Sequence, residues 1–255
     1  MVEILAEVNY PSEAANPPLL VIHGLFGAAK NWGALCKRFA LTRPVLAVDL
    51  RNHGQSPWSD THSYADMAED LSRTLKAHGG TWDVLGHSMG GKAAMMLALT
   101  EPSLIDRLIV GDIAPVTYDH DQSQFINAMK SLDLAPLTRR SEADKAFAVE
   151  DPAVRAFLLQ SLDFTEKPPS WRLNIATLER EMPKVLSFPD TSASHSGPTL
   201  FLSGGASHYV TAEGRAAATA LFPNAEFAEL EGAGHWLHAE QPNAFLEAVE
   251  RFLKR

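Results

Sequence analysis

Short apolar runs alternate with segments of helical periodicity along most of the chain. Val45–Val48 and Leu108–Val110 are continuous apolar runs, typical of strands that are buried on both faces of a parallel sheet. Tyr64–His78 carries large apolar residues at four-residue spacing and predicts an amphipathic helix that ends at Gly79-Gly80. Further strands are expected at residues 2–9, Leu19–Ile22, Thr81–Leu85, Pro198–Leu202 and Glu226–Leu230, and further helices at Asn31–Leu41, from Gly90 onward, at Ala212–Leu221 and at Asn243–Leu253. The pattern predicts an α/β fold with a mainly parallel central sheet and helices on both faces.

The alternation breaks between residues 116 and 195. This stretch contains helix-like patches and no strand-like run; the patches are Phe125–Leu132, Ser141–Val149, Pro152–Leu162 and Trp171–Leu178. Because the stretch follows one strand end and precedes the next strand, we expect an inserted helical lid, residues 116–195, over a core of residues 1–115 and 196–255. The pattern does not say which of its large apolar residues line a pocket and which pack inside the lid: Phe125, Met129, Phe157, Leu158, Trp171 and Phe188.

Gly86-His87-Ser88-Met89-Gly90 fits the G-x-S-x-G pattern of a nucleophile elbow. A strand-like run precedes it and an Ala-, Met- and Leu-rich helical segment follows, so Ser88 is expected at the apex of a sharp strand-to-helix turn. Such a turn needs small neighbours two residues before and two after the serine, and both positions are glycines. A third glycine, Gly91, lets the helix pack closely on the sheet.

A serine hydroxyl becomes a nucleophile only when a base takes its proton, and a histidine is the base suited to neutral pH. His235 lies in a glycine-rich loop after the last predicted strand, at the same edge of the sheet as Ser88, and is the expected base. His87 is expected to face away from the site into the packing below. His23 and His53 are expected to brace loops.

The base needs a carboxylate to hold its tautomer. The loop after Pro198–Leu202 has no acid before Glu213, whereas Asp112 follows the preceding strand in an apolar setting, where an unpaired carboxylate would be costly. We therefore expect Asp112 to be the acid. An alternative is that Asp112 only braces the start of the lid.

An oxyanion hole completes the site. One donor is expected to be the backbone N–H of Met89, which begins a helix. The second is expected from the Gly24–Gly27 loop, with Leu25 favoured over Phe26. Phe26 and Trp236, aromatic neighbours of this loop and of the base, are the expected substrate contacts.

Composition limits the partners. The net charge of −9 argues against nucleic acid and anionic membrane surfaces, and no apolar run of membrane-spanning length is present. The single cysteine, Cys36, and an N-terminus without signal-peptide features lead us to expect a cytoplasmic protein. We also expect a monomer or a small homo-oligomer. No dinucleotide fingerprint or metal motif occurs, so neither a cofactor nor a metal is expected. Asp60 and His62 have the spacing of a ligand pair but are expected to be solvated.

The motifs HGLFG, DLRNHGQS, GHSMGG and GAGHW, in this order, resemble those of the α/β-hydrolase family over essentially the whole chain. Asp112 in GDIAP, with Ser207 where most members place the acid, resembles the small esterase and thioesterase branch. The resemblance implies hydrolysis of acyl esters or thioesters with short to medium acyl chains by Ser88, His235 and Asp112. C–C bond hydrolysis, a cofactor-free lyase reaction and, in another class, a small-molecule receptor remain alternatives on the same scaffold.

Overall fold

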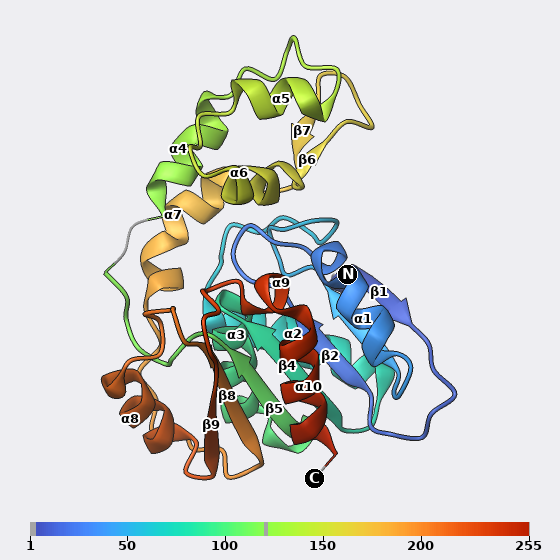
Figure 1. The fold of residues 1–255 in the computed structure, drawn as a ribbon, viewed down its shortest axis with the longest axis vertical. Helices are drawn as coiled ribbons and strands as arrows, with labels where there is room; N and C mark the ends of the chain where they lie inside the picture. Colours follow the sequence, from blue (N-terminus) through green and yellow to red (C-terminus); the bar gives the residue numbers. More distant parts are fainter. Residues whose placement is uncertain (1–3, 120–121, 255) are drawn as a thin grey trace.

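The computed structural model describes residues 4–119 and 122–254, so Val2 of the first predicted strand lies outside the described residues. A seven-stranded sheet in the order β1-β3-β2-β4-β5-β8-β9 runs through the core (Figure 1). β1 pairs antiparallel with β3, and every other neighbouring pair in this sheet is parallel. The strands are β1 (Glu7–Tyr10), β2 (Leu19–Ile22), β3 (Val45–Val48), β4 (Trp82–His87), β5 (Ile105–Gly111), β8 (Thr199–Gly204) and β9 (Ala225–Leu230). The predicted mainly parallel sheet is confirmed.

Helices cover both faces of this sheet, because the side chains of each inner strand alternate between two apolar layers. Leu19 and Val21 of β2 pack with α1 and α10, whereas Leu20 and Ile22 pack with α2, α3 and α8. The helices of the core are α1 (Gly33–Phe39), α2 (Tyr64–His78), α3 (Met89–Thr100), α8 (Ala212–Leu221), α9 (Leu237–Glu240) and α10 (Pro242–Leu253), with short 3-10 turns η1 (Ala29–Trp32) and η2 (Pro102–Leu104). Within the described residues, no helix is both long and apolar enough to cross a bilayer.

The start of α2 shows how the local sequence sets these boundaries. Ser63 is its N-cap, and the Ser63 side chain accepts a hydrogen bond from the Asp66 backbone N–H while Asp66 bonds back to the N–H of Ser63. This reciprocal pair satisfies N–H groups that a helix start would otherwise leave open. The helix ends at Gly79, whose φ of 75° is a conformation that favours glycine.

In the expected lid, residues 116–195, the described segments that form helices and short strands lie beyond one end of the parallel strands (Figure 1). Their elements are α4 (Ser123–Ser131), α5 (Arg140–Ala146), α6 (Pro152–Leu159), β6 (Leu162–Asp163), β7 (Ser170–Trp171) and α7 (Ile175–Leu186). The expectation that no strand interrupts the helices was wrong, because β6 and β7 form an antiparallel hairpin. Each strand has two residues, which is too short to produce an alternating pattern in the sequence.

Lys92 ties the two ends of the lid to the core. It lies one turn after the elbow in α3, and its side chain is 1% exposed. The Lys92 ammonium donates to the backbone oxygens of Val116 at 2.7 Å, Leu186 at 3.0 Å and Ser187 at 2.7 Å, which lie where the chain enters and leaves the lid. Burial lowers the pKa of Lys92 to about 7, and the three carbonyl groups accept all three protons of its charged form.

Replacing Lys92 should therefore destabilise the fold although the volume is kept. Lys92→Met leaves three half-buried carbonyl groups without their donor, and we expect a loss of about 2–4 kcal/mol in the free energy of unfolding, measured by urea denaturation. Lys76→Met is the control, since Lys76 is 54% exposed and makes a surface ion pair with Glu101. A Lys92→Met loss no larger than the control's would contradict this role.

Candidate active site

Ser88 lies at the sharp turn between β4 and α3. Its φ of 53° is in the left-handed region, which costs about 1 kcal/mol or more for a residue with a side chain. The turn leaves no room for side chains on either side: a Cβ on Gly86 would lie 2.2 Å from the carbonyl oxygen of Gly90, and one on Gly90 would lie 2.3 Å from that of His23. The predicted elbow geometry thus follows from the two glycines.

Three side chains from different strand ends form one hydrogen-bonded chain. His235 Nε2 is 3.1 Å from Ser88 Oγ, and His235 Nδ1 is 2.7 Å from Asp112 Oδ2. Asp112 is fully buried, and its carboxylate also accepts bonds from the Gly204 backbone N–H at 3.0 Å and from the Ser207 hydroxyl. An ionised Asp112 makes His235 carry its proton on Nδ1, so Nε2 is left to accept the proton of Ser88.

Tyr209, to which the sequence pattern assigned no role, packs against His235. Its ring stacks on that of His235, with centroids 3.9 Å apart and planes inclined by 17°. The Tyr209 backbone oxygen accepts a hydrogen bond from Tyr118 Oη at 2.7 Å, which links the segment around Tyr209 to the start of the lid. In the sequence, its position two residues after Ser207, in a loop at the end of a strand, was the signal that Tyr209 lies near the site.

The Gly24–Gly27 loop passes directly over Ser88. A Cβ on Gly24 would lie 3.2 Å from the Ser88 Cβ. The Gly27 N–H closes a tight turn onto the Gly24 oxygen at 3.0 Å, and the Phe26 N–H donates to His53 Nε2 at 3.2 Å. Within the described residues, the N–H groups of Leu25 and Met89 have no hydrogen-bond partner in the protein. Leu25, rather than Phe26, is therefore the residue of this loop with a donor to offer.

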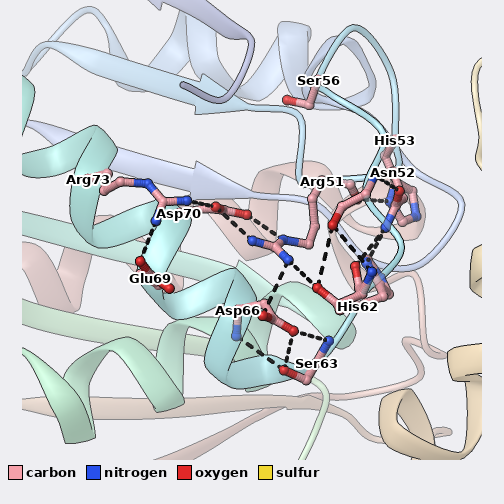
Figure 2. Close-up of polar contacts among 12 residues, drawn as sticks. Arg51, Asn52, His53, Ser56, His62, Ser63, Asp66, Glu69, Asp70 and Arg73 are labelled. Atoms are coloured by element: carbon pink, nitrogen blue, oxygen red, sulfur yellow. Dashed lines mark hydrogen bonds and ion pairs between the residues drawn. The ribbon is translucent and has the colours of Figure 1, made fainter. Parts of the chain in front are cut away.

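The loop that carries His53 is braced on α2 (Figure 2). Arg51 makes two hydrogen bonds to Asp70, from Nε at 2.5 Å and from Nη2 at 2.9 Å, and Arg73 holds the same carboxylate. The Asn52 side chain donates to the Thr61 oxygen at 3.0 Å. Because a two-point arginine–carboxylate pair fixes orientation as well as distance, the position of His53 is set from the body of the core.

A cavity of about 220 Å³ lies above Ser88 between the core and the lid. Phe26 and Trp236, the expected substrate contacts, both line it. Of the lid's large apolar residues, Phe125, Phe157 and Leu158 line it as well, whereas Trp171 bonds to the Met129 oxygen inside the lid. Among the described residues, no group of three or more His, Cys, Asp or Glu is arranged to hold a metal ion.

Comparison with known proteins identifies the family to which this fold belongs. Residues 17–242 match the family model of the alpha/beta hydrolase fold. The chain belongs to the α/β-hydrolase family. It is 41% identical over 252 residues to the sn-1-specific diacylglycerol lipase ABHD11 of Mus musculus, covering 94% of this chain and 82% of that protein. It is 38% identical over 244 residues to the esterase YbfF of Escherichia coli, covering 93% of each.

A solved structure described as a marine microorganism esterase has a TM-score of 0.93 and 33% identity, and the match covers 98% of this chain and 99% of that one. The predicted α/β-hydrolase fold and the resemblance to its esterases are confirmed. The names of these relatives agree with the prediction of an enzyme that cleaves ester bonds.

Two expectations about histidines in this α/β-hydrolase need correction. His62 is fully buried rather than solvated, and Nε2 of its ring lies 3.4 Å from Met89 Sδ. His87 is buried as expected but faces the loop that carries His235, because its Nε2 lies 2.8 Å from the His235 backbone oxygen. The sequence shows neither contact, since both join segments that are distant along the chain.

His23 and His53 brace loops, and both must be neutral to do so. Each accepts a backbone N–H at Nε2, from Leu50 and Phe26 respectively, and each has Nδ1 beside a backbone oxygen. Burial lowers the pKa of His23 to about 4. Burial, together with the repulsion that a second proton on His23 would add, lowers the pKa of His53 to about 3. A proton on either Nε2 would remove the acceptor.

These values predict a fold that is sensitive to acid. Below pH 6.5 the unfolded chain takes up protons at both histidines while the folded chain does not, so stability falls as the pH drops from 7 to 4. Each histidine accounts for about 3 kcal/mol over that range. We expect His53→Gln, which cannot titrate, to show a shallower dependence of the unfolding free energy on pH, and the exposed His208→Gln to keep the native dependence. Equal slopes in all three proteins would contradict neutral burial of His53.

Proposed function

We propose that this α/β-hydrolase is a serine hydrolase that cleaves acyl esters or thioesters through an acyl-enzyme intermediate, with Ser88, His235 and Asp112 as its catalytic triad. The observation that carries the proposal is the hydrogen-bonded order of these side chains, 3.1 Å from serine to histidine and 2.7 Å from histidine to aspartate. The esterase and lipase names of the relatives support an acyl ester as the bond that is cleaved.

In the first half of the reaction, Ser88 Oγ attacks the acyl carbonyl carbon while His235 Nε2 takes the hydroxyl proton. The carbonyl oxygen becomes an oxyanion, which the open N–H groups of Leu25 and Met89 stabilise. Asp112 balances the imidazolium charge of His235. His235 then gives the proton to the leaving alcohol or thiol, and the acyl group stays on Ser88.

In the second half, water replaces the leaving group. His235 takes a proton from the water as the oxygen attacks the acyl-enzyme, and the same two N–H groups hold the second oxyanion. The proton then returns to Ser88 Oγ as the carboxylic acid leaves. No cofactor takes part in either half.

The cavity supports acyl chains of short to medium length. Its volume of about 220 Å³ is below the roughly 300–1,000 Å³ that is typical of pockets for drug-sized ligands. Phe26 and Trp236 give it an aromatic wall near Ser88, and the lid gives it aliphatic and aromatic side chains. The same pocket suits an ester or a thioester, because both present an acyl group to Ser88 and differ in the group that leaves.

The first test compares the native chain with Ser88→Ala on p-nitrophenyl esters from acetate to laurate. We expect initial rates to fall on the order of 10⁴-fold or more in the mutant, with an unchanged fold by circular dichroism. The chain-length optimum of the native enzyme reports the depth of the pocket. A Ser88→Ala protein with near-native hydrolysis would end this proposal; a folded native protein without activity would shift it to C–C hydrolysis, a lyase reaction or ligand binding.

A second test concerns the acid. Asparagine has nearly the same shape as aspartate, but in Asp112→Asn the side chain favours the His235 tautomer whose Nε2 already carries a proton. We therefore expect kcat to fall on the order of 10³- to 10⁴-fold. Glu213→Gln, at an exposed position in the first turn of α8, should leave kcat unchanged. Full activity in Asp112→Asn together with a loss in Glu213→Gln would move the acid to Glu213.

A further inference from the structure

Phe26 holds a backbone conformation that it would not adopt by itself. Its φ is 62°, at the third residue of the turn that the Gly27 N–H closes onto the Gly24 oxygen. A turn of this kind usually has glycine or asparagine at that residue, because a side chain makes a positive φ costly. Something outside the turn must therefore hold Phe26, and with it the adjoining Leu25, in place.

The core supplies one of the contacts. The Phe26 N–H donates to His53 Nε2 at 3.2 Å, and His53 is itself fixed by its Nδ1 at 3.0 Å from the Arg51 oxygen. This contact determines the orientation of the peptide group between Leu25 and Phe26. The Phe26 carbonyl oxygen belongs to the next peptide group, so it needs a hydrogen-bond donor from another part of the protein.

The lid supplies the second contact. Ser161, which follows α6 and is 4% exposed, donates its hydroxyl proton to the Phe26 backbone oxygen at 2.9 Å. Ser161 is rigid, because its N–H bonds to the Leu158 oxygen at 3.0 Å and its own oxygen accepts the Arg172 N–H at 2.8 Å. In Figure 1 the lid helix α6 lies over loops at the end of the core that faces the lid.

Gln160, which precedes Ser161, also joins the lid to the core. Gln160 accepts a hydrogen bond from Lys30 at its backbone oxygen and one from the Asn31 side chain at Oε1, both at 2.6 Å. Lys30 and Asn31 belong to η1, which begins two residues after the Gly24–Gly27 loop, here called the oxyanion loop. The end of α6 therefore docks on the oxyanion loop and on the turn that follows it.

We propose that Ser161 is a positioning residue for the oxyanion hole, so that the lid, when docked, completes the turn that aims the Leu25 N–H at the reacting carbonyl oxygen. The inference rests on the proposed function. The peptide groups on both sides of Phe26 are held, one by His53 of the core and the other by Ser161 of the lid. Without Ser161, a buried carbonyl loses its partner and the strained Phe26 is free to relax.

The test measures kcat and KM for p-nitrophenyl butyrate in the native enzyme, Ser161→Ala and Gln55→Ala. Gln55→Ala is the matched control, because Gln55 accepts a hydrogen bond from Arg172 of the lid at 2.9 Å and does not touch the oxyanion loop. We expect kcat to fall about 5- to 50-fold in Ser161→Ala with KM changed less than about twofold, since a misplaced donor weakens transition-state stabilisation. Gln55→Ala should match the native enzyme.

A trifluoromethyl ketone gives a second readout, because it forms a tetrahedral adduct with the serine and places an oxyanion in the hole. Its inhibition constant should rise in Ser161→Ala by the same factor as kcat falls, and Ser161→Cys, which keeps a weak donor, should lie between alanine and native. An unchanged kcat in Ser161→Ala, or an equal loss in Gln55→Ala, would overturn the role of Ser161 while leaving the triad in place. If hydrolysis persisted in Ser88→Ala, the proposed function and this inference would both fail.

Discussion

The site depends on one buried carboxylate. Asp112 follows β5 with a φ of 47°, is fully buried, and accepts bonds from Gly204, Ser207 and His235. A charge without water must be compensated by donors, so these bonds hold the loops after β5, β8 and β9 at fixed positions relative to one another. Ser207, in the loop after β8, donates a hydrogen bond to Asp112. A carboxylate at the position of Ser207 would instead repel Asp112. The orientation of His235 toward Ser88 follows from this arrangement.

The lid is attached to the core at positions that also serve the site. Lys92, one turn after Ser88, holds both lid ends through three carbonyl groups, and the end of α6 docks on the turn over Ser88. These contacts join the lid, the Gly24–Gly27 loop and the start of α3 into one connected structure.

The sequence predicted what depends on local pattern. The buried strands at Val45–Val48 and Leu19–Ile22, the helix Tyr64–His78 and the elbow glycines are confirmed in position, because apolar runs, capping residues and tight turns are properties of neighbouring residues. It missed the hairpin β6–β7 because each strand has only two residues. It missed the burial of His62 and the contacts of Phe26 because these depend on residues distant in the sequence. Lys92 is the lone lysine in the apolar segment after the elbow, and this position indicated a buried charge that needs partners. Only the fold shows that these partners are carbonyl groups at the ends of the lid.

The most direct measurement of the central claim is the intact mass of the protein after reaction with a fluorophosphonate, followed by peptide mapping. We predict one adduct per chain, on Ser88, with no labelling in Ser88→Ala and much slower labelling in His235→Gln, because the phosphonyl group needs the activated serine and leaves an oxygen in the oxyanion hole. A folded native protein that is not labelled, or that is labelled at another residue, would contradict the proposed role of Ser88.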